Sequence, residues 1–236
     1  MTIDLILDVI LSLVAVFTAI VFHEVAHGWV ASRLGDPTAK AHGRLTLNPL
    51  AHVDPVGTIL VPVTLALLNL LFPGANTPLF GWAKPVPVNP NYFANRFRGM
   101  LWVALAGPGT NLALAAIGAG VGRLALRGVS AQVVLQPAGF GDYAIRALFA
   151  LLGLFVIYSV ILAVFNMIPI PPLDGSRVLA YFLPPEGRRA LFAAERYGFL
   201  ILLVLIGFGG VSFLFNAIQP LWVRLLGPAW LVMIFG

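Results

Sequence analysis

Long apolar runs are the feature that most limits what this chain can fold into. A membrane-spanning helix needs about 20 mostly apolar residues, and several such stretches follow one another along the sequence. They are residues 3–30, 56–72, 99–124, 147–168, 199 to beyond 215, and a short tail at 221–235. Of the 236 residues, 60% are hydrophobic and only 10% are charged. This balance excludes an ordinary soluble domain and a disordered chain, and it predicts a multi-pass membrane protein.

The same runs predict the architecture. We expect an all-α helix bundle of about 4–6 membrane segments that forms one integral-membrane domain over residues 1–236. Its core is expected at 1–183 and its C-terminal membrane segments at 197–236, where the tail either spans or lies at the interface. Between the first two runs, polar residues alternate with small or apolar ones over 40–47, which predicts a short membrane-associated β-like segment.

The first apolar run contains a motif that indicates metal chemistry. It reads H-E-x-x-H, in the residues His23-Glu24-Val25-Ala26-His27. On a helix, positions i and i+4 share a face, so both imidazoles can reach one ion. Zinc bound in this way lowers the pKa of a bound water to about 7, and the neighbouring Glu24 can take its proton. Ionisable groups within an apolar helix are unfavourable in lipid, which argues against a chance match.

Two histidines do not complete a catalytic zinc site, which usually has three protein ligands. The chain has no cysteine, so the third ligand must be His42, His52 or a carboxylate. Asp174 stands out because it follows the fourth apolar run after three prolines. Broken backbone at membrane depth is tolerated only where it is buried in protein or lines a wet cavity. The other interpretation makes Asp174 an N-cap of the next helix, and the two roles are compatible.

Three motifs together resemble those of the site-2 protease family of intramembrane zinc metalloproteases. They are the H-E-x-x-H motif, the run Gly107-Pro108-Gly109-Thr110-Asn111, and the stretch 166–175, which matches the pattern N-x-x-P-x-P-x-x-D-G. The resemblance covers about residues 15–180, and the order of the motifs also agrees. The chain resembles a compact form of the family without a PDZ or CBS domain.

The resemblance implies a role for each site residue. His23, His27 and Asp174 would hold one Zn²⁺ per chain, Glu24 would act as general base, and Asn166 would bind substrate or stabilise the oxyanion. It also implies an intramembrane endopeptidase that cuts peptide bonds within or near transmembrane segments of other membrane proteins, as in regulated intramembrane proteolysis.

The basic residues predict how the chain is oriented in the bilayer. If segment 56–72 is re-entrant, the first and fourth runs are parallel and the loop charges divide 10 to 3; if it spans, they divide 6 to 7. The larger group contains Arg33, Lys40, Arg44, Lys84, Arg96, Arg98, Arg177, Arg188, Arg189 and Arg196, and the smaller one Arg123, Arg127 and Arg146. Only the first division obeys the positive-inside rule. It predicts a re-entrant segment and an active site nearer the cytoplasm, in a prokaryotic cell membrane. We expect no nucleic-acid partner.

Several polar residues have both a structural and a functional interpretation. His42 and His52 are interpreted as hydrogen-bonded structural groups, with auxiliary ligands or gates as the alternative. Asp54 before a proline predicts a turn or cap, and Asn111 predicts an interhelical hydrogen bond. The β-like segment 40–47 is either an edge for an extended substrate or a structural plug.

Two other functions fit parts of the pattern. A divalent metal-ion transporter could use the same intramembrane ligands, but it would not need Glu24 as a base. An inactive relative that only binds membrane proteins is disfavoured, because all four implied catalytic positions are filled. The physiological substrate and the oligomeric state do not follow from the sequence.

Overall fold

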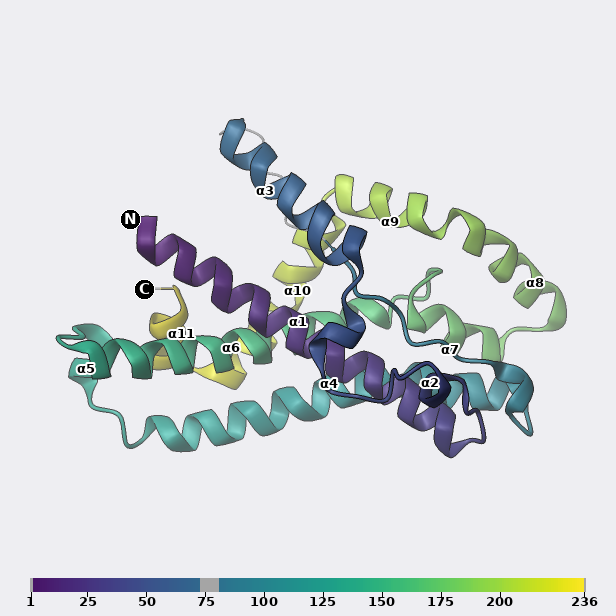
Figure 1. The fold of residues 1–236 in the computed structure, drawn as a ribbon, viewed down its shortest axis with the longest axis horizontal. Helices are drawn as coiled ribbons and strands as arrows, with labels where there is room; N and C mark the ends of the chain where they lie inside the picture. Colours follow the sequence, from purple (N-terminus) through teal and green to yellow (C-terminus); the bar gives the residue numbers. More distant parts are fainter. Residues whose placement is uncertain (1, 73–80, 236) are drawn as a thin grey trace.

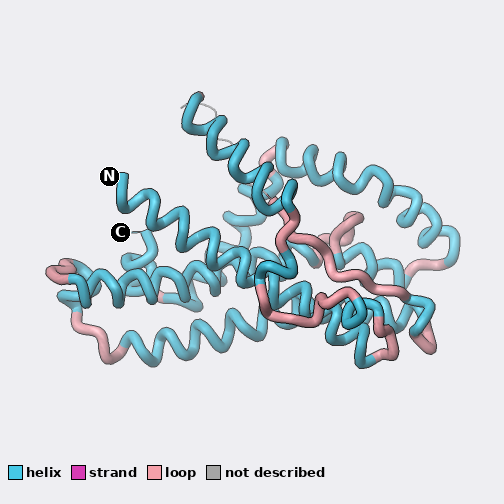
Figure 2. The backbone as a smooth tube through the Cα atoms, viewed as in Figure 1, coloured by secondary structure: helices cyan, strands magenta, loops and turns pink. Residues whose placement is uncertain are grey.

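The computed structural model describes residues 2–72 and 81–235, and no strand occurs within them (Figure 2). The chain is helical over most of its length (Figure 1). The elements are α1 Thr2–Arg33, α2 Thr38–Ala41, η1 Pro49–His52, η2 Pro55–Leu60, α3 Val61–Leu71, η3 Pro90–Tyr92, α4 Arg96–Leu126, α5 Ala131–Leu135, α6 Phe140–Asn166, α7 Asp174–Phe182, α8 Pro185–Ala194, η4 Glu195–Tyr197, α9 Gly198–Gly207, α10 Gly210–Leu226 and α11 Pro228–Phe235.

Three long helices, α1, α4 and α6, form the centre of the molecule, and each packs against the other two. They contain three candidate membrane spans, at Leu7–Arg33, Arg96–Leu126 and Phe140–Asn166. Small buried residues of α4, such as Gly107, let the neighbouring helices approach closely. An all-α architecture with candidate membrane spans is therefore confirmed for the described residues.

The directions of these three helices place the H-E-x-x-H motif of α1 and the stretch 166–175 at the same end of the bundle. In Figure 1, α1 and α6 run from left to right and α4 runs back between the same two ends. The first and fourth apolar runs are therefore parallel, as expected if segment 56–72 does not cross. The end of α1 and the start of α7 consequently lie at the same end of the bundle (Figure 1).

Segment 56–72 folds as η2 and α3, a short apolar helical arm outside the three candidate spans. The chain returns to the start of this arm, because the Trp82 N–H donates to the Gly57 carbonyl at 3.1 Å. The Asp54 carboxylate accepts from the backbone N–H groups of Val56 and Gly57, which confirms its predicted capping role. That segment 56–72 does not cross the bilayer stays a prediction, and an arm whose two ends meet at one place is the form that a re-entrant segment takes.

The β-like prediction for residues 40–47 is wrong in this structure. Residues Thr38–Ala41 form the single helical turn α2, and the rest of the segment is irregular. The Asp36 carboxylate accepts from both the N–H and the hydroxyl of Thr38, which starts the turn. Gly43 then ends it with a φ of +65°. A period-two pattern also needs a neighbouring strand, and none is present in the described residues, so the edge hypothesis falls with the strand.

The predicted fifth segment, from 199 to beyond 215, is interrupted. Helix α9 ends at Gly207, and Gly209 has a φ of +78°, a left-handed conformation that L side chains rarely adopt. The proline-rich stretch 74–90 lies partly outside the described residues, and its described part has no regular structure before η3.

The C-terminal tail turns back against the bundle. Helices α10 and α11 meet at Gly227, which has a φ of +80°, and the apolar stretches on either side are bent by 111°. Trp230 of α11 is fully buried and its indole N–H donates to the Phe149 carbonyl of α6 at 2.7 Å. The described residues contain three candidate spans, or up to four if the bent pair counts as one span, so the predicted number of 4–6 is not confirmed.

Candidate metal centre

Helix α1 presents His23, Glu24 and His27 toward the interior of the bundle. The two imidazole rings lie 4.6 Å apart between centroids, and the histidines are 5% and 8% exposed. One ligand atom from each of the three residues lies within 4.8 Å of the others. The i, i+4 spacing predicted from the sequence therefore gives one compact group of donor atoms.

Asp174 completes this group from a segment 151 residues away. Its Oδ2 atom lies 3.1 Å from His23 Nε2 and 3.3 Å from His27 Nε2. It is the first residue of α7 and makes no N-cap bond, because the cap position is Leu173. The carboxylate faces the histidines instead, so the capping interpretation is wrong.

The start of α7 can approach this closely only because residue 175 is glycine. A Cβ atom at Gly175 would lie 2.3 Å from the Met167 carbonyl oxygen and 2.5 Å from that of Ile168. The broken backbone after α6 therefore packs directly on the first turn of α7. This contact sets the position of Asp174 next to α1.

The donor atoms fit a tetrahedral zinc ion. Ligand atoms about 2.0–2.1 Å from zinc in this geometry lie about 3.3 Å from one another. His27 Nδ1 donates to the Val103 carbonyl at 2.7 Å, so a neutral His27 turns its Nε2 lone pair toward Asp174. Two acceptors then face each other at 3.3 Å, and a cation between them removes this conflict.

Electrostatics favour an ionised Asp174, which lies outside the three candidate spans. Burial raises the pKa of this carboxyl, but hydrogen bonds from His23 and His27 in their protonated forms, and the positive charges of these forms, outweigh burial. They lower its pKa to about 2. The carboxylate is therefore anionic at any physiological pH, as a ligand for a cation must be.

One face of α4 forms the wall behind the two histidines. Val103, Gly107 and Asn111 recur every four residues on that face. The Val103 carbonyl accepts from His27, while Asn111 Nδ2 lies 3.4 Å from His23 Nδ1, which confirms the predicted interhelical contact. Between them, a Cβ at Gly107 would lie 2.5 Å from His27 Nε2 and 2.6 Å from His23 Nε2, so only glycine fits.

Glu24 is held by the backbone of the segment that precedes η3. Its Oε2 atom accepts a hydrogen bond from the Val86 N–H at 2.8 Å. The same segment packs on α1, because a Cβ at Gly28 would lie 2.8 Å from Val86 Cγ1. The buried Asp36 fixes its far end by accepting from the Asn89 N–H at 2.7 Å.

The other candidate residues lie outside this group. Asn166 is the last residue of α6, and its amide donates to the Leu162 carbonyl at 3.0 Å. His42 bonds the Thr38 carbonyl and the fully buried His52 bonds the Thr46 carbonyl, both at 2.9 Å. The interpretation of both histidines as hydrogen-bonded structural groups is confirmed.

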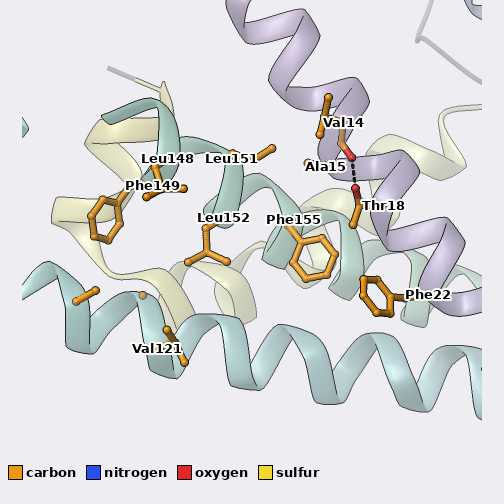
Figure 3. A pocket seen from close by; sticks show the side chains of 12 residues that line it. Val14, Ala15, Thr18, Phe22, Val121, Leu148, Phe149, Leu151, Leu152 and Phe155 are labelled. Carbon is orange, nitrogen blue, oxygen red and sulfur yellow. Dashed lines mark hydrogen bonds between the residues drawn. The ribbon is translucent and has the colours of Figure 1, made fainter. Parts of the chain in front are cut away.

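An apolar groove lies between the middle of α1, the last turns of α4 and the middle of α6 (Figure 3). Its volume is about 520 Å³, and its lining is almost wholly carbon. Phe22, which precedes His23, and Phe155 face each other at 6.4 Å between ring centroids at the end nearer the motif (Figure 3). The groove therefore lies within the candidate spans and ends next to the metal-binding group.

Comparison with known proteins assigns the chain to a family. A family model described as peptidase family M50 matches residues 120–207, which contain Asp174. The "Putative zinc metalloprotease YwhC" of Bacillus subtilis (strain 168) is 39% identical over 197 residues, 83% of this chain and 78% of that relative. The chain belongs to peptidase family M50. No solved structure matches this M50 chain.

Two more distant M50 relatives agree. Proteins named "Putative zinc metalloprotease Rip2" from Mycolicibacterium smegmatis (strain ATCC 700084 / mc(2)155) and Mycobacterium tuberculosis (strain ATCC 25618 / H37Rv) are 33% and 34% identical over 185 and 184 residues. Both matches cover 78% of this chain but 61% of the relative. All of these relatives are bacterial.

Membership of family M50 confirms the resemblance to the site-2 proteases. The chain is accordingly a zinc metalloprotease that acts on protein substrates, and its cofactor is Zn²⁺. Sequence reasoning missed the backbone groups of Val103 and Val86 that hold His27 and Glu24. No side-chain signal could have identified them, because every residue other than proline carries the same donor and acceptor.

Proposed function

We propose that this protein is an intramembrane zinc endopeptidase that hydrolyses peptide bonds within or near the transmembrane segments of other membrane proteins. His23, His27 and Asp174 hold the metal, and Glu24 is the general base. The observation that carries this proposal is that two imidazole nitrogens lie 3.1 and 3.3 Å from one carboxylate oxygen inside a bundle of candidate spans. Family membership alone does not locate the reaction in the bilayer.

Zinc, Glu24 and the backbone of Val86 have different roles in the proposed reaction. Zinc supplies Lewis-acid chemistry, which makes a water molecule nucleophilic near neutral pH. Glu24 stands beside the two histidines, and the Val86 N–H holds its Oε2 atom. Its Oε1 atom is then available to take a proton from the attacking water and to return it to the leaving amine. The hydrogen bond from Val86 fixes the carboxylate without adding a charge.

Asn166 is proposed to bind the substrate next to this centre. It ends α6 eight residues before Asp174, so the same chain segment carries both residues. Its amide uses one N–H on the Leu162 carbonyl, which leaves the other N–H and the oxygen for a substrate backbone.

The substrate is proposed to approach through the apolar groove. A transmembrane helix presents apolar side chains at the depth of the groove, and this lining has almost no polar atoms. The groove ends at Phe22 and Phe155, next to His23. This continuity favours a substrate helix as the occupant over a lipid chain that makes no use of the metal centre.

The active site is proposed to lie nearer the cytoplasm. The ten basic residues of the larger group lie in two stretches, from the last turn of α1 to the first turn of α4 and from α7 to η4. The smaller group lies from the last turn of α4 to the second turn of α6. The positive-inside rule then orients the metal-binding end toward the cytoplasm. The parallel arrangement of α1 and α6 in Figure 1 supports this division.

The experiment that tests the proposal is co-expression with single-pass membrane proteins of the host. Wild-type protein is compared with Glu24→Gln, which removes the base but leaves the three proposed ligands. We expect wild-type protein to release fragments cut at a transmembrane segment, and Glu24→Gln to keep zinc and lose cleavage. Full cleavage by Glu24→Gln would contradict the assignment of Glu24 as the general base. Zinc flux through that variant in vesicles would favour a transporter.

A further inference from the structure

Asn111 is a fully buried polar residue of α4 whose hydrogen bonding is incomplete. Its Oδ1 atom is buried and has no hydrogen-bond partner in the part of the chain that the structure describes. Its Nδ2 atom lies 3.4 Å from Nδ1 of His23. An unpaired buried acceptor of this kind is unfavourable, so it needs an explanation.

The two histidines of α1 differ in how their outer nitrogens are held. His27 Nδ1 donates to the Val103 carbonyl, which can only accept, so its Nε2 lone pair is free for a metal. His23 has no carbonyl in the matching position. Eight residues further along the same face of α4, its Nδ1 meets the side chain of Asn111 instead.

The hydrogen-bond partner that His23 Nδ1 needs depends on whether Nε2 binds a metal. Without metal, His23 Nε2 can donate its proton to Asp174 Oδ2 at 3.1 Å, and Nδ1 then accepts from the Asn111 NH₂ group. When Nε2 gives its lone pair to a metal, Nδ1 carries the proton and needs an acceptor. A half-turn of the Asn111 amide exchanges its nitrogen and oxygen and supplies that acceptor. The oxygen that lacks a partner is then satisfied.

We propose that Asn111 is a positioning residue for the zinc centre, whose amide oxygen holds His23 in the tautomer that binds metal through Nε2. The inference rests on the proposed function, because it assigns the group behind one of the three proposed ligands. An amide suits the position because it can donate to His23 in the empty site and accept from it in the loaded one. Together with the Val103 carbonyl, it makes α4 the support for both histidines.

The test measures zinc affinity of the purified full-length protein in detergent, by competition with a chromophoric chelator. Three variants are compared with wild type: Asn111→Leu, which removes the acceptor, Asn111→Asp, which keeps it in the same shape, and Ser159→Ala. Ser159 is the matched control, because it is also fully buried in the bundle and its hydroxyl has no hydrogen-bond partner in the described residues.

We expect Asn111→Leu to lose about 10–100-fold in zinc affinity, as is usual when a group behind a metal ligand is removed. Asn111→Asp should stay within about threefold of wild type, because its carboxylate accepts from Nδ1–H, and Ser159→Ala should not differ from wild type. A merely structural role predicts the reverse order, because an isolated buried carboxylate is unfavourable and leucine is not.

Two results would overturn the positioning role: unchanged affinity in Asn111→Leu, or an equal loss in Asn111→Leu and Asn111→Asp. Circular dichroism of each variant shows whether it is folded. If Asn111→Leu does not fold, the affinity of the isosteric Asn111→Asp alone decides, since a loss there contradicts the proposal. If wild-type protein binds no zinc, the proposed function itself fails, and that result is distinct from a failure of Asn111 alone.

Discussion

Replacing Gly107 by alanine tests whether the backbone of α4 sets the positions of both metal-binding histidines. The added methyl carbon would lie 2.5 Å from His27 Nε2 and 2.6 Å from His23 Nε2. Ordinary contacts between such atoms are about 3.5 Å or longer, so the rings or the helix must move by about 1 Å. Distances in a zinc site tolerate about 0.2 Å. The required shift is several times larger than the site can absorb.

We expect Gly107→Ala to lower the cleavage rate and the zinc affinity strongly and the free energy of unfolding only slightly. Misplacement of reacting groups by about 1 Å lowers rates about 100-fold, and we expect a fall of that order in cleavage of a membrane substrate. Zinc affinity should fall at least about tenfold. Overpacking by one methyl group should lower the free energy of unfolding by about 1–3 kcal/mol, so the protein should remain folded.

The matched control for this substitution lies two residues along the same helix. A Cβ at Gly109 would meet no atom within 4 Å, so Gly109→Ala adds the same methyl group without a clash. Zinc content, chelator competition and cleavage rate are measured for both variants and for wild type. If Gly107→Ala matched Gly109→Ala in all three, α4 would not hold the histidines and the reasoning would be refuted.

Three other substitutions test separate parts of the molecule. Asp174→Asn keeps the shape of the side chain but removes the negative charge of the proposed ligand. The variant should lose zinc to a competing chelator, while its helix content stays unchanged. Retention of zinc would contradict the role of Asp174 as a metal ligand. Val121→Trp should fill the apolar groove and slow cleavage of a membrane substrate. The control is Ile117→Trp, which is similarly exposed on α4 but lies outside the groove and should not slow cleavage. Equal cleavage rates for the two variants would contradict substrate entry through the groove. In Gly122→Ala the new Cβ would lie 1.9 Å from the Trp230 ring. The free energy of unfolding, measured by thermal unfolding, should fall by about 1–3 kcal/mol. An unchanged Tm would contradict the packing of α11 on α4.

The sequence predicted the parts of this fold that follow from a strong local rule. In a bilayer the backbone must satisfy its own hydrogen bonds, so three long apolar runs could only become α1, α4 and α6. The helix period likewise placed His23 and His27 on one face. The pairing of Asp174 with them spans 151 residues. The broken backbone before Asp174 made it a candidate, and the resemblance to a family implied that it is the third ligand.

The failures have equally specific causes. Alternation over eight residues predicted a strand at 40–47, but the carboxylate of Asp36 starts a helical turn there, and periodicity does not register such a bond. The break between α9 and α10 depends on the left-handed Gly209. Gly207, Gly209 and Gly210 are a local signal for a break, but a prediction from the length of the apolar run does not register it. The backbone groups that hold His27 and Glu24 belong to ordinary residues, so no residue type could reveal them.

The central claim is that this metalloprotease cuts its substrates in the membrane, with Glu24 as the base. The most direct measurement reconstitutes purified protein and a single-pass substrate in lipid vesicles and maps both product termini by mass spectrometry. The account predicts new termini within or next to the transmembrane segment, which appear with wild-type protein and not with Glu24→Gln. Termini confined to the water-soluble part of the substrate, or the same products from Glu24→Gln, would contradict it.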